Sequence, residues 1–115
     1  MQWLSSAPAP IPDHIQIGYS KDEPARRAFA ELAAADWEAF LSCRSAEMVS
    51  DAQLVIVTMA SHDDGAFGYG PVLEAMTRGL EDLVETGLIT PAEVSRMVIP
   101  TYARTRREFE APFAS

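Results

Sequence analysis

The side chains best suited to chemistry lie in a polar, glycine-bearing loop. His62, Asp63 and Asp64 open it, and Gly65, Gly68 and Gly70 follow. An imidazole beside two carboxylates could support acid–base or metal chemistry, and closely spaced glycines could let backbone amides approach a phosphate. Neither pattern is specific, because the loop lacks both Gly-x-Gly-x-x-Gly and the lysine of a phosphate-binding loop. We therefore interpret it as a connector and expect no metal site and no catalytic dyad.

The segment leading into this loop, residues 54–60, reads Leu-Val-Ile-Val-Thr-Met-Ala. An apolar run without polar alternation is typical of a strand buried on both faces of a parallel sheet. Ligand sites in open α/β sheets gather in the loops after such strands. A central strand needs neighbours for its backbone groups, yet the chain offers one other short candidate, residues 14–19. Either the chain belongs to a larger sheet, or the strand is misinterpreted.

Helices are predicted on either side of that strand by capping patterns. Ser20–Glu23 is a capping box that opens the longest helix, which should end near Met48. A second helix is expected from Pro71 to Glu85, and boxes at Thr90–Glu93 and Thr105–Glu108 open two short ones. The side chains expected to face the core are Phe29, Leu32, Ala33, Trp37, Phe40 and Leu41 in the first helix, Leu73, Met76, Leu80, Leu83 and Val84 in the second, and Phe109 and Phe113 in the last.

Composition and charge narrow the class of protein. The 115 residues are 48% hydrophobic and 23% charged, which fits one globular domain. A formal charge of -8 argues against nucleic acid or an anionic membrane as a partner. Arg104, Arg106 and Arg107 alternate with glutamates and are expected on a solvated helix face.

The single cysteine and the absence of long apolar runs bear on location. Cys43 cannot form an intrachain disulfide, so a reducing, cytoplasmic setting is expected, with the thiol as a small buried filler. No stretch approaches about 18 consecutive apolar residues, so no membrane span is predicted.

Five segments occur in the order seen in one family. They are Gln2–Ser5, Trp37–Arg44, Leu54–Met59, Thr86–Ile89 and Ile99–Tyr102. The chain resembles the S-adenosylmethionine-dependent carboxyl methyltransferases of the salicylate, benzoate and theobromine synthase (SABATH) type, and looks closest to their bacterial homologues. The resemblance covers essentially the whole chain and rests on the five segments together.

The resemblance implies an α/β fold: a class I (Rossmann-like) methyltransferase core, built on a seven-stranded, mostly parallel sheet, with a helical cap over the substrate. Residues 1–61 would be part of the core, with one central strand, and residues 62–115 the acceptor-binding cap and the start of the C-terminal region. The family's main elements for binding S-adenosylmethionine would precede Gln2, and its last strands would follow Ser115. The chain is therefore expected to be a C-terminal-half fragment, mostly α-helical and inactive by itself.

The resemblance also implies acceptor-site residues. Trp3 matches the tryptophan whose indole N–H holds the substrate carboxylate, and Gln2 matches its neighbour. Met59 and Tyr102 match pocket-lining positions. Val72 and Leu73 match a pair whose second member is tryptophan in plant salicylate enzymes, so Leu73 departs from the pattern for an aromatic acid. Packing in the core is the alternative role for Trp3, Met59 and Leu73.

The implied reaction is in-line methyl transfer from the sulfonium of S-adenosylmethionine to a small carboxylic acid, which is already ionised at neutral pH and needs little acid–base help. The full-length protein could form a homodimer. Two other functions stay open. One is a non-catalytic helical module that pairs with a full-length homologous subunit through its strand edge. The other is a helical ligand carrier using the loop at residues 67–69.

Overall fold

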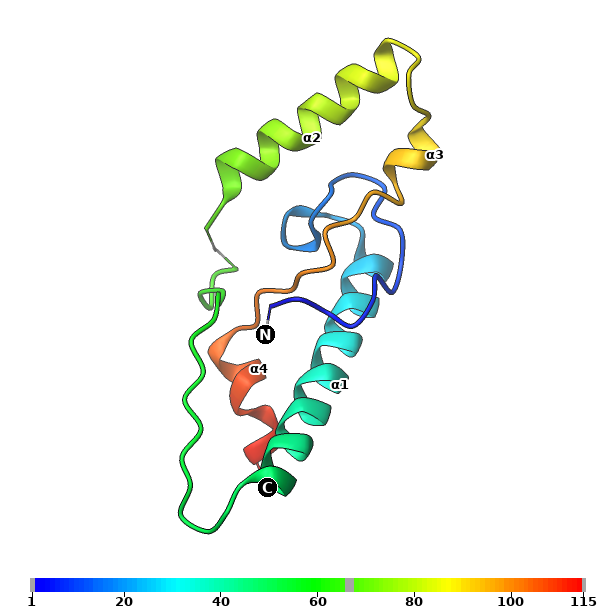
Figure 1. Ribbon diagram of the computed structural model, residues 1–115. Helices are drawn as coiled ribbons and strands as arrows, with labels where there is room; N and C mark the ends of the chain where they lie inside the picture. Colours follow the sequence, from blue (N-terminus) through cyan, green and yellow to red (C-terminus); the bar gives the residue numbers. More distant parts are fainter. Residues whose placement is uncertain (1, 66–67, 115) are drawn as a thin grey trace.

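The computed structural model describes residues 2–65 and 68–114. The molecule is elongated, with extents of 59 × 24 × 21 Å. Its longest helix, α1, runs roughly along the long axis (Figure 1). Within the described residues the secondary structure is helical, with two isolated β-bridges in place of a sheet. The elements are η1 (Ile17–Tyr19), α1 (Glu23–Glu47), α2 (Gly70–Glu85), α3 (Pro91–Val94), α4 (Arg106–Glu110) and η2 (Ala111–Phe113).

Helix α1 begins two residues later than a cap at Ser20 would require. The carboxylate of Asp22 accepts a hydrogen bond of 2.9 Å from the N–H of Ala25 and is the N-cap. The Ser20 hydroxyl instead accepts from the N–H of Asp22 and donates to Asp13. The predicted cap was wrong because Ser20 is committed to the turn before the helix, whereas Pro24 fits the first helical turn as expected.

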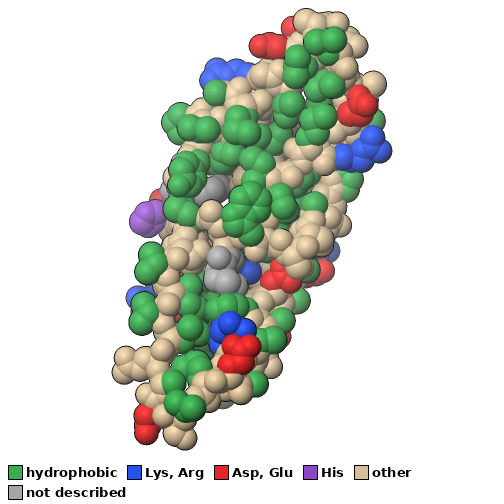
Figure 2. All heavy atoms as spheres, viewed as in Figure 1, with side chains coloured by type: hydrophobic (Ala, Val, Ile, Leu, Met, Phe, Trp, Pro, Cys, Tyr) green, Lys and Arg blue, Asp and Glu red, His purple; other side chains and the backbone are tan. Residues whose placement is uncertain are grey.

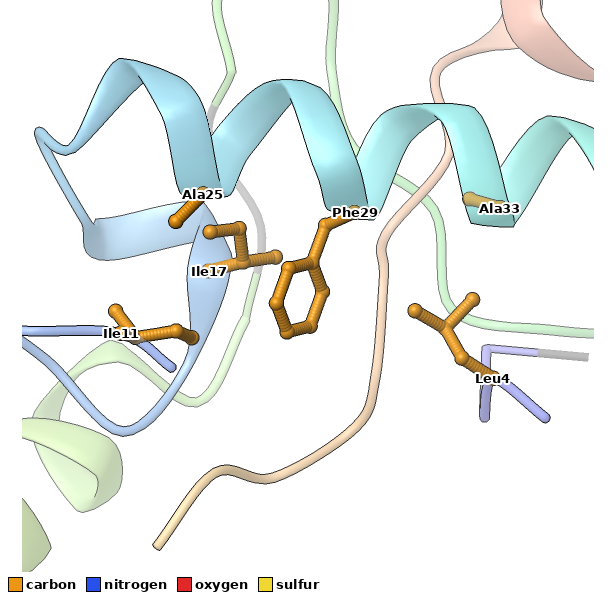
Figure 3. Close-up of a cluster of buried hydrophobic side chains, with 6 residues drawn as sticks. All are labelled: Leu4, Ile11, Ile17, Ala25, Phe29 and Ala33. Atoms are coloured by element: carbon orange, nitrogen blue, oxygen red, sulfur yellow. The ribbon is translucent and has the colours of Figure 1, made fainter. Parts of the chain in front are cut away.

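The apolar stripe of α1 is confirmed as the side that faces the core. Phe29 is fully buried, and Ala25, Ala33 and Trp37 are buried at four-residue intervals around it. Figure 3 shows the Phe29 ring lying between Ile17 and Leu4. The core cluster comprises Leu4, Ile11, Ile17, Ala25, Phe29 and Ala33, with Leu32, Val98 and Tyr102 packed against it.

An extended segment, residues 98–104, runs between the N-terminal residues and the chain before η1. Leu4 N–H donates to Pro100 O and Tyr102 N–H to Gln2 O, both at 2.8 Å, and Trp3 forms an antiparallel bridge with Thr101. Ile99 N–H donates to Ile15 O at 2.8 Å. The edge strand predicted at residues 14–19 does not form, because the chain turns into η1 instead.

The strand predicted at residues 54–60 does not form either. Its one β-bridge joins Ala60 to Arg104 in parallel, and Ser61 N–H donates to Arg104 O at 2.9 Å. Val55 and Val57 are 82% and 95% exposed. In Figure 1 this green segment runs beside α4 without a sheet next to it. The described residues supply no strand to pair with it, so the α/β core is not formed here and the described fold is mostly helical.

Helix α2 lies at one end of the molecule (Figure 1), and its expected inner face is only partly buried. Leu73 is buried, whereas Met76 and Leu83 are exposed, contrary to the prediction. Gly87 ends the helix region with φ of +75°, a conformation that glycine adopts without strain. In the C-terminal region Phe109 is half-buried, but Phe113 is 70% exposed and does not face the core. Figure 2 shows hydrophobic side chains spread over this face of the molecule.

Arg104 and Cys43 differ in burial from the prediction. Arg104 is 2% exposed, and its guanidinium donates to Ala33 O, so it packs between α1 and α4. Arg106 and Arg107 are on the solvated face as expected. Cys43 is exposed because it lies off the buried stripe of α1.

Both capping boxes, at Thr90 and Thr105, are confirmed. In the described part of the chain, no helix has the length and apolar character needed to cross a membrane.

Candidate functional site

One cavity gathers side chains from five separate parts of the chain. It has a volume of about 170 Å³ and is lined by Gln2, Trp3, Gln16, Met59, Tyr69, Val72, Leu73, Ile99, Thr101 and Ala103. The structure therefore brings five of the six predicted acceptor-site residues together at one place. They come from the N-terminal residues, the end of the segment at residues 54–60, and the first turns of α2.

Trp3 is placed by its backbone rather than by packing of its ring. Its bridge to Thr101, and the bonds made by Gln2 and Leu4 on either side, fix the chain at the cavity. The side chain is 62% exposed. Among the described residues, the indole N–H of Trp3 makes no hydrogen bond. Trp3 is thus not a core aromatic here: it is an exposed residue that lines a largely apolar cavity, and its indole N–H is a neutral donor.

Gln16 lies in the cavity wall and was not predicted as a site residue. It is 2% exposed, and its Nε2 donates to the carbonyl and hydroxyl oxygens of Thr101 at 3.2 and 3.3 Å. Its Oε1 accepts from the N–H of Gly18 at 2.5 Å. In the sequence Gln16 stands between Ile15 and Ile17, which are both buried. This position could have marked it, because a buried side-chain amide needs hydrogen-bond partners.

Tyr69 also lines the cavity, and it precedes α2 in a left-handed conformation. Its φ is 70°, which is uncommon for a residue other than glycine. It occupies the N-cap position without a side-chain cap, and its ring is 61% exposed. This conformation places the ring at the cavity next to Val72 and Leu73. Phe67, which the carrier hypothesis also uses, is outside the described residues.

Tyr102 lies apart from the other predicted residues. Thr101 and Ala103 line the cavity, and consecutive side chains of an extended segment point to opposite sides. The Tyr102 hydroxyl donates to Glu108 Oε1 at 2.6 Å. Burial raises the pKa of Tyr102, and the hydrogen bond and charge of Glu108 raise it further.

The second cavity, which Tyr102 does line, is larger and more polar. Its volume is about 520 Å³, and its walls include Arg26, Asp64, Tyr102 and Glu108. The carboxylate of Glu108 is already engaged by Tyr102 and by the capping box of Thr105. His62, Asp63 and Asp64 are exposed. In residues 2–65 and 68–114 no group of three His, Cys, Asp or Glu side chains could hold a metal ion.

The walls around Trp3 carry no charged side chain to hold the amino acid group or the ribose of S-adenosylmethionine. In the polar cavity the carboxylate of Glu108, one of its two acidic groups, is engaged in capping α4. What the Trp3 cavity can do is bind an apolar molecule and offer it neutral hydrogen-bond donors from Trp3 and Gln2.

The sequence profile described as "SAM dependent carboxyl methyltransferase" matches residues 1–113, nearly the whole chain. The chain belongs to this family of S-adenosylmethionine-dependent carboxyl methyltransferases. It is also 27% identical over 127 aligned positions to Gibberellic acid methyltransferase 2 of Arabidopsis thaliana. That alignment covers 96% of this chain and 33% of the relative, so the chain spans about a third of the length of the curated relative it matches.

Proposed function

We propose that this chain is the acceptor-binding part of a methyltransferase that methylates the carboxylate of a small organic acid, and that it is inactive without the cofactor-binding part. The observation that carries the proposal is the cavity at which Gln2, Trp3, Met59, Val72 and Leu73 meet. Family membership supports the reaction type. The absence of charged side chains from the walls around Trp3 supports inactivity of the chain by itself.

Binding would begin with the carboxylate at Trp3. The indole N–H is a neutral donor, so it can hold one carboxylate oxygen without neutralising its charge as a salt bridge would. Gln2 supplies a second neutral donor beside it. The apolar walls displace water from the acid's hydrocarbon part, which leaves the carboxylate less hydrated and fixed in orientation.

The walls also favour one class of acid. Leu73 is buried in the cavity at the position where plant salicylate enzymes of this family have tryptophan. Without that large flat ring, an aliphatic or alicyclic group can occupy the space beside Val72 and Met59. We therefore propose a non-aromatic carboxylic acid as the acceptor.

Nuclear magnetic resonance of the two indole N–H groups tests acceptor binding. Trp37 Nε1 donates to Phe109 O at 3.0 Å, whereas the Trp3 donor is open. Titration with cyclohexanecarboxylate should shift the Trp3 signal and leave the Trp37 signal in place. The methyl ester of the same acid, which lacks the anionic oxygen, is the matched control and should bind more weakly. A Trp3→Phe variant assigns the signals, and in calorimetric titration it should bind the acid and the ester with similar affinity.

Two outcomes would count against the proposal. Equal shifts from the acid and its ester would show that the cavity does not recognise a carboxylate. Transfer of label from S-adenosylmethionine to a panel of carboxylic acids by the purified chain would show that the chain is not inactive by itself.

A second candidate function is favoured by the exposed segment at residues 54–60. Val55 and Val57 are more than four-fifths exposed, and an unpaired apolar segment is a template for strand addition. The chain would then be a non-catalytic module that pairs with a full-length homologous subunit. Calorimetric titration of that subunit with the chain should show tight binding that a Val57→Lys variant weakens. If no heat of binding is observed, the module hypothesis is wrong and the methyltransferase proposal is retained.

A further inference from the structure

Asp36 of α1 holds the segment that carries Trp3. We call residues 2–5 the N-terminal strap. The two carboxylate oxygens of Asp36 accept hydrogen bonds from the N–H and the hydroxyl of Ser5, each at 2.8 Å. Both bonds end on an ionised acceptor and form a two-point contact between groups 31 residues apart in the sequence. Asp36 thus connects α1 directly to the strap, two residues after Trp3.

The strap is fixed on its other side by backbone bonds. Gln2 and Leu4 bond to residues 102 and 100, and Trp3 is bridged to Thr101. Leu4 is buried in the core, but residues 5–8 are exposed. Ser5 therefore has little packing to hold it, and the two bonds to Asp36 fix this end of the strap.

The orientation of Trp3 depends on this backbone, because its ring is 62% exposed and so is held only in part by neighbouring side chains. If the strap frays from Ser5 backwards, the peptide groups on either side of Trp3 lose their fixed direction. The indole would then sample many positions relative to the cavity. Holding a donor in one position before the ligand arrives lowers the entropic cost of binding.

Asp36 has a second electrostatic neighbour. It lies near enough to the buried guanidinium of Arg104 that its negative charge raises the pKa of Arg104, against the lowering caused by burial. Arg104 in turn donates to Ala33 O, one turn before Trp37 on the same helix. The anion that holds the strap is therefore itself held near a fixed cation, which favours one position of its side chain.

We propose that Asp36 is a positioning residue for carboxylate recognition: through Ser5 it holds the strap so that the Trp3 indole stays at the cavity. This proposal rests on the proposed function, because it concerns the same binding site. It assigns Asp36 no contact with the substrate.

Three variants and one control test it. Asp36→Ala removes both bonds to Ser5. Asp36→Asn keeps one oxygen acceptor, and Ser5→Ala keeps the backbone N–H donor, so both should have intermediate effects. Glu38→Ala is the control, because Glu38 is an exposed carboxylate on the same helix. Intact folding is checked from the helical circular-dichroism signal of each variant.

The first measurement needs no ligand. Backbone ¹⁵N relaxation of residues 2–5 should show increased motion in Asp36→Ala and unchanged motion in Glu38→Ala. The second is the dissociation constant for cyclohexanecarboxylate from the Trp3 indole shift. Loss of two charge-assisted bonds should weaken binding about tenfold in Asp36→Ala, and about threefold in Ser5→Ala.

The two measurements separate this proposal from the one it rests on. If the unmodified chain does not bind the acid, the proposed function fails and Asp36 has no role in recognition. If it binds and Asp36→Ala binds equally well with an unchanged strap, the positioning role is wrong. Weaker binding with a reduced helical circular-dichroism signal would indicate general destabilisation and would also overturn it.

Discussion

Replacing Arg104 is the most demanding test of how the described residues hold together. Its Nη2 and Nε donate to Ala33 O at 2.7 and 3.2 Å, and its Cζ lies 5.9 and 6.0 Å from the ring centres of Trp37 and Phe109. A hydrogen bond from a charged group contributes about 1.5–3 kcal/mol, and a cation–π contact about 0.5–2 kcal/mol. The desolvation of the buried guanidinium opposes these favourable contributions, and it also lowers the pKa of Arg104.

The net effect depends on what replaces the side chain. Methionine keeps the aliphatic stem and removes the buried charge, so Arg104→Met should lower the free energy of unfolding by about 1–2 kcal/mol. Alanine also leaves a cavity between α1 and α4, so Arg104→Ala should lower it by about 3 kcal/mol. We therefore expect the free energy of unfolding to be lowest with alanine at position 104, higher with methionine and highest with arginine.

Urea denaturation followed by circular dichroism measures both values. Arg106→Ala is the control, because Arg106 is exposed and its ion pair with Glu110, at 2.7 Å, lies in solvent. The control should leave the denaturation midpoint unchanged. If Arg104→Ala melts at the same urea concentration as Arg106→Ala, the guanidinium does not join the two helices and the reasoning is refuted.

Three further predictions follow from local contacts. Thr105→Ala removes the acceptor that caps Glu108 N–H and should cost about 1 kcal/mol in urea denaturation, whereas Thr105→Ser should be near neutral. Phe29→Leu, in the fully buried position, should cost about 1–2 kcal/mol, while Phe113→Leu at an exposed position should leave the midpoint unchanged. In alkaline titration at 295 nm, Tyr102 should ionise above the ordinary range of a tyrosine, because burial and Glu108 raise its pKa. Its contribution to stability is complete below about pH 10 and is lost as pH rises through the folded-state pKa, and Tyr102→Phe should remove that loss.

The helices could be predicted from the sequence because their signals are local. The capping boxes at Thr90 and Thr105 each lie within four residues, and the stripe through Phe29 and Trp37 follows from helical periodicity. Arg104 could not be predicted in the same way. Charges alternating along the chain suggested a solvated face, but its partner is the carbonyl of Ala33, 71 residues away.

The candidate site was predicted only as far as the resemblance reached. Gln2, Trp3, Met59, Val72 and Leu73 meet at one cavity, although nothing in their local spacing requires it. Gln16 and Asp36 were missed as site residues because their importance lies in long-range hydrogen bonds, to Thr101 and to Ser5. Such partners follow from the tertiary fold and leave no periodic pattern in the sequence.

The segment at residues 54–60 has features of a strand and ends at the cavity that Trp3 lines. Val55 and Val57 are exposed, whereas Ile56 and Thr58 are partly buried, so exposure alternates over residues 55–58 as it does along a strand with one face covered. The parallel bridge between Ala60 and Arg104 shows the geometry in which such pairing begins. Met59, one residue before that bridge, lies in the wall of the Trp3 cavity. A strand added along residues 54–58 would therefore also restrain Met59 in the wall of that cavity.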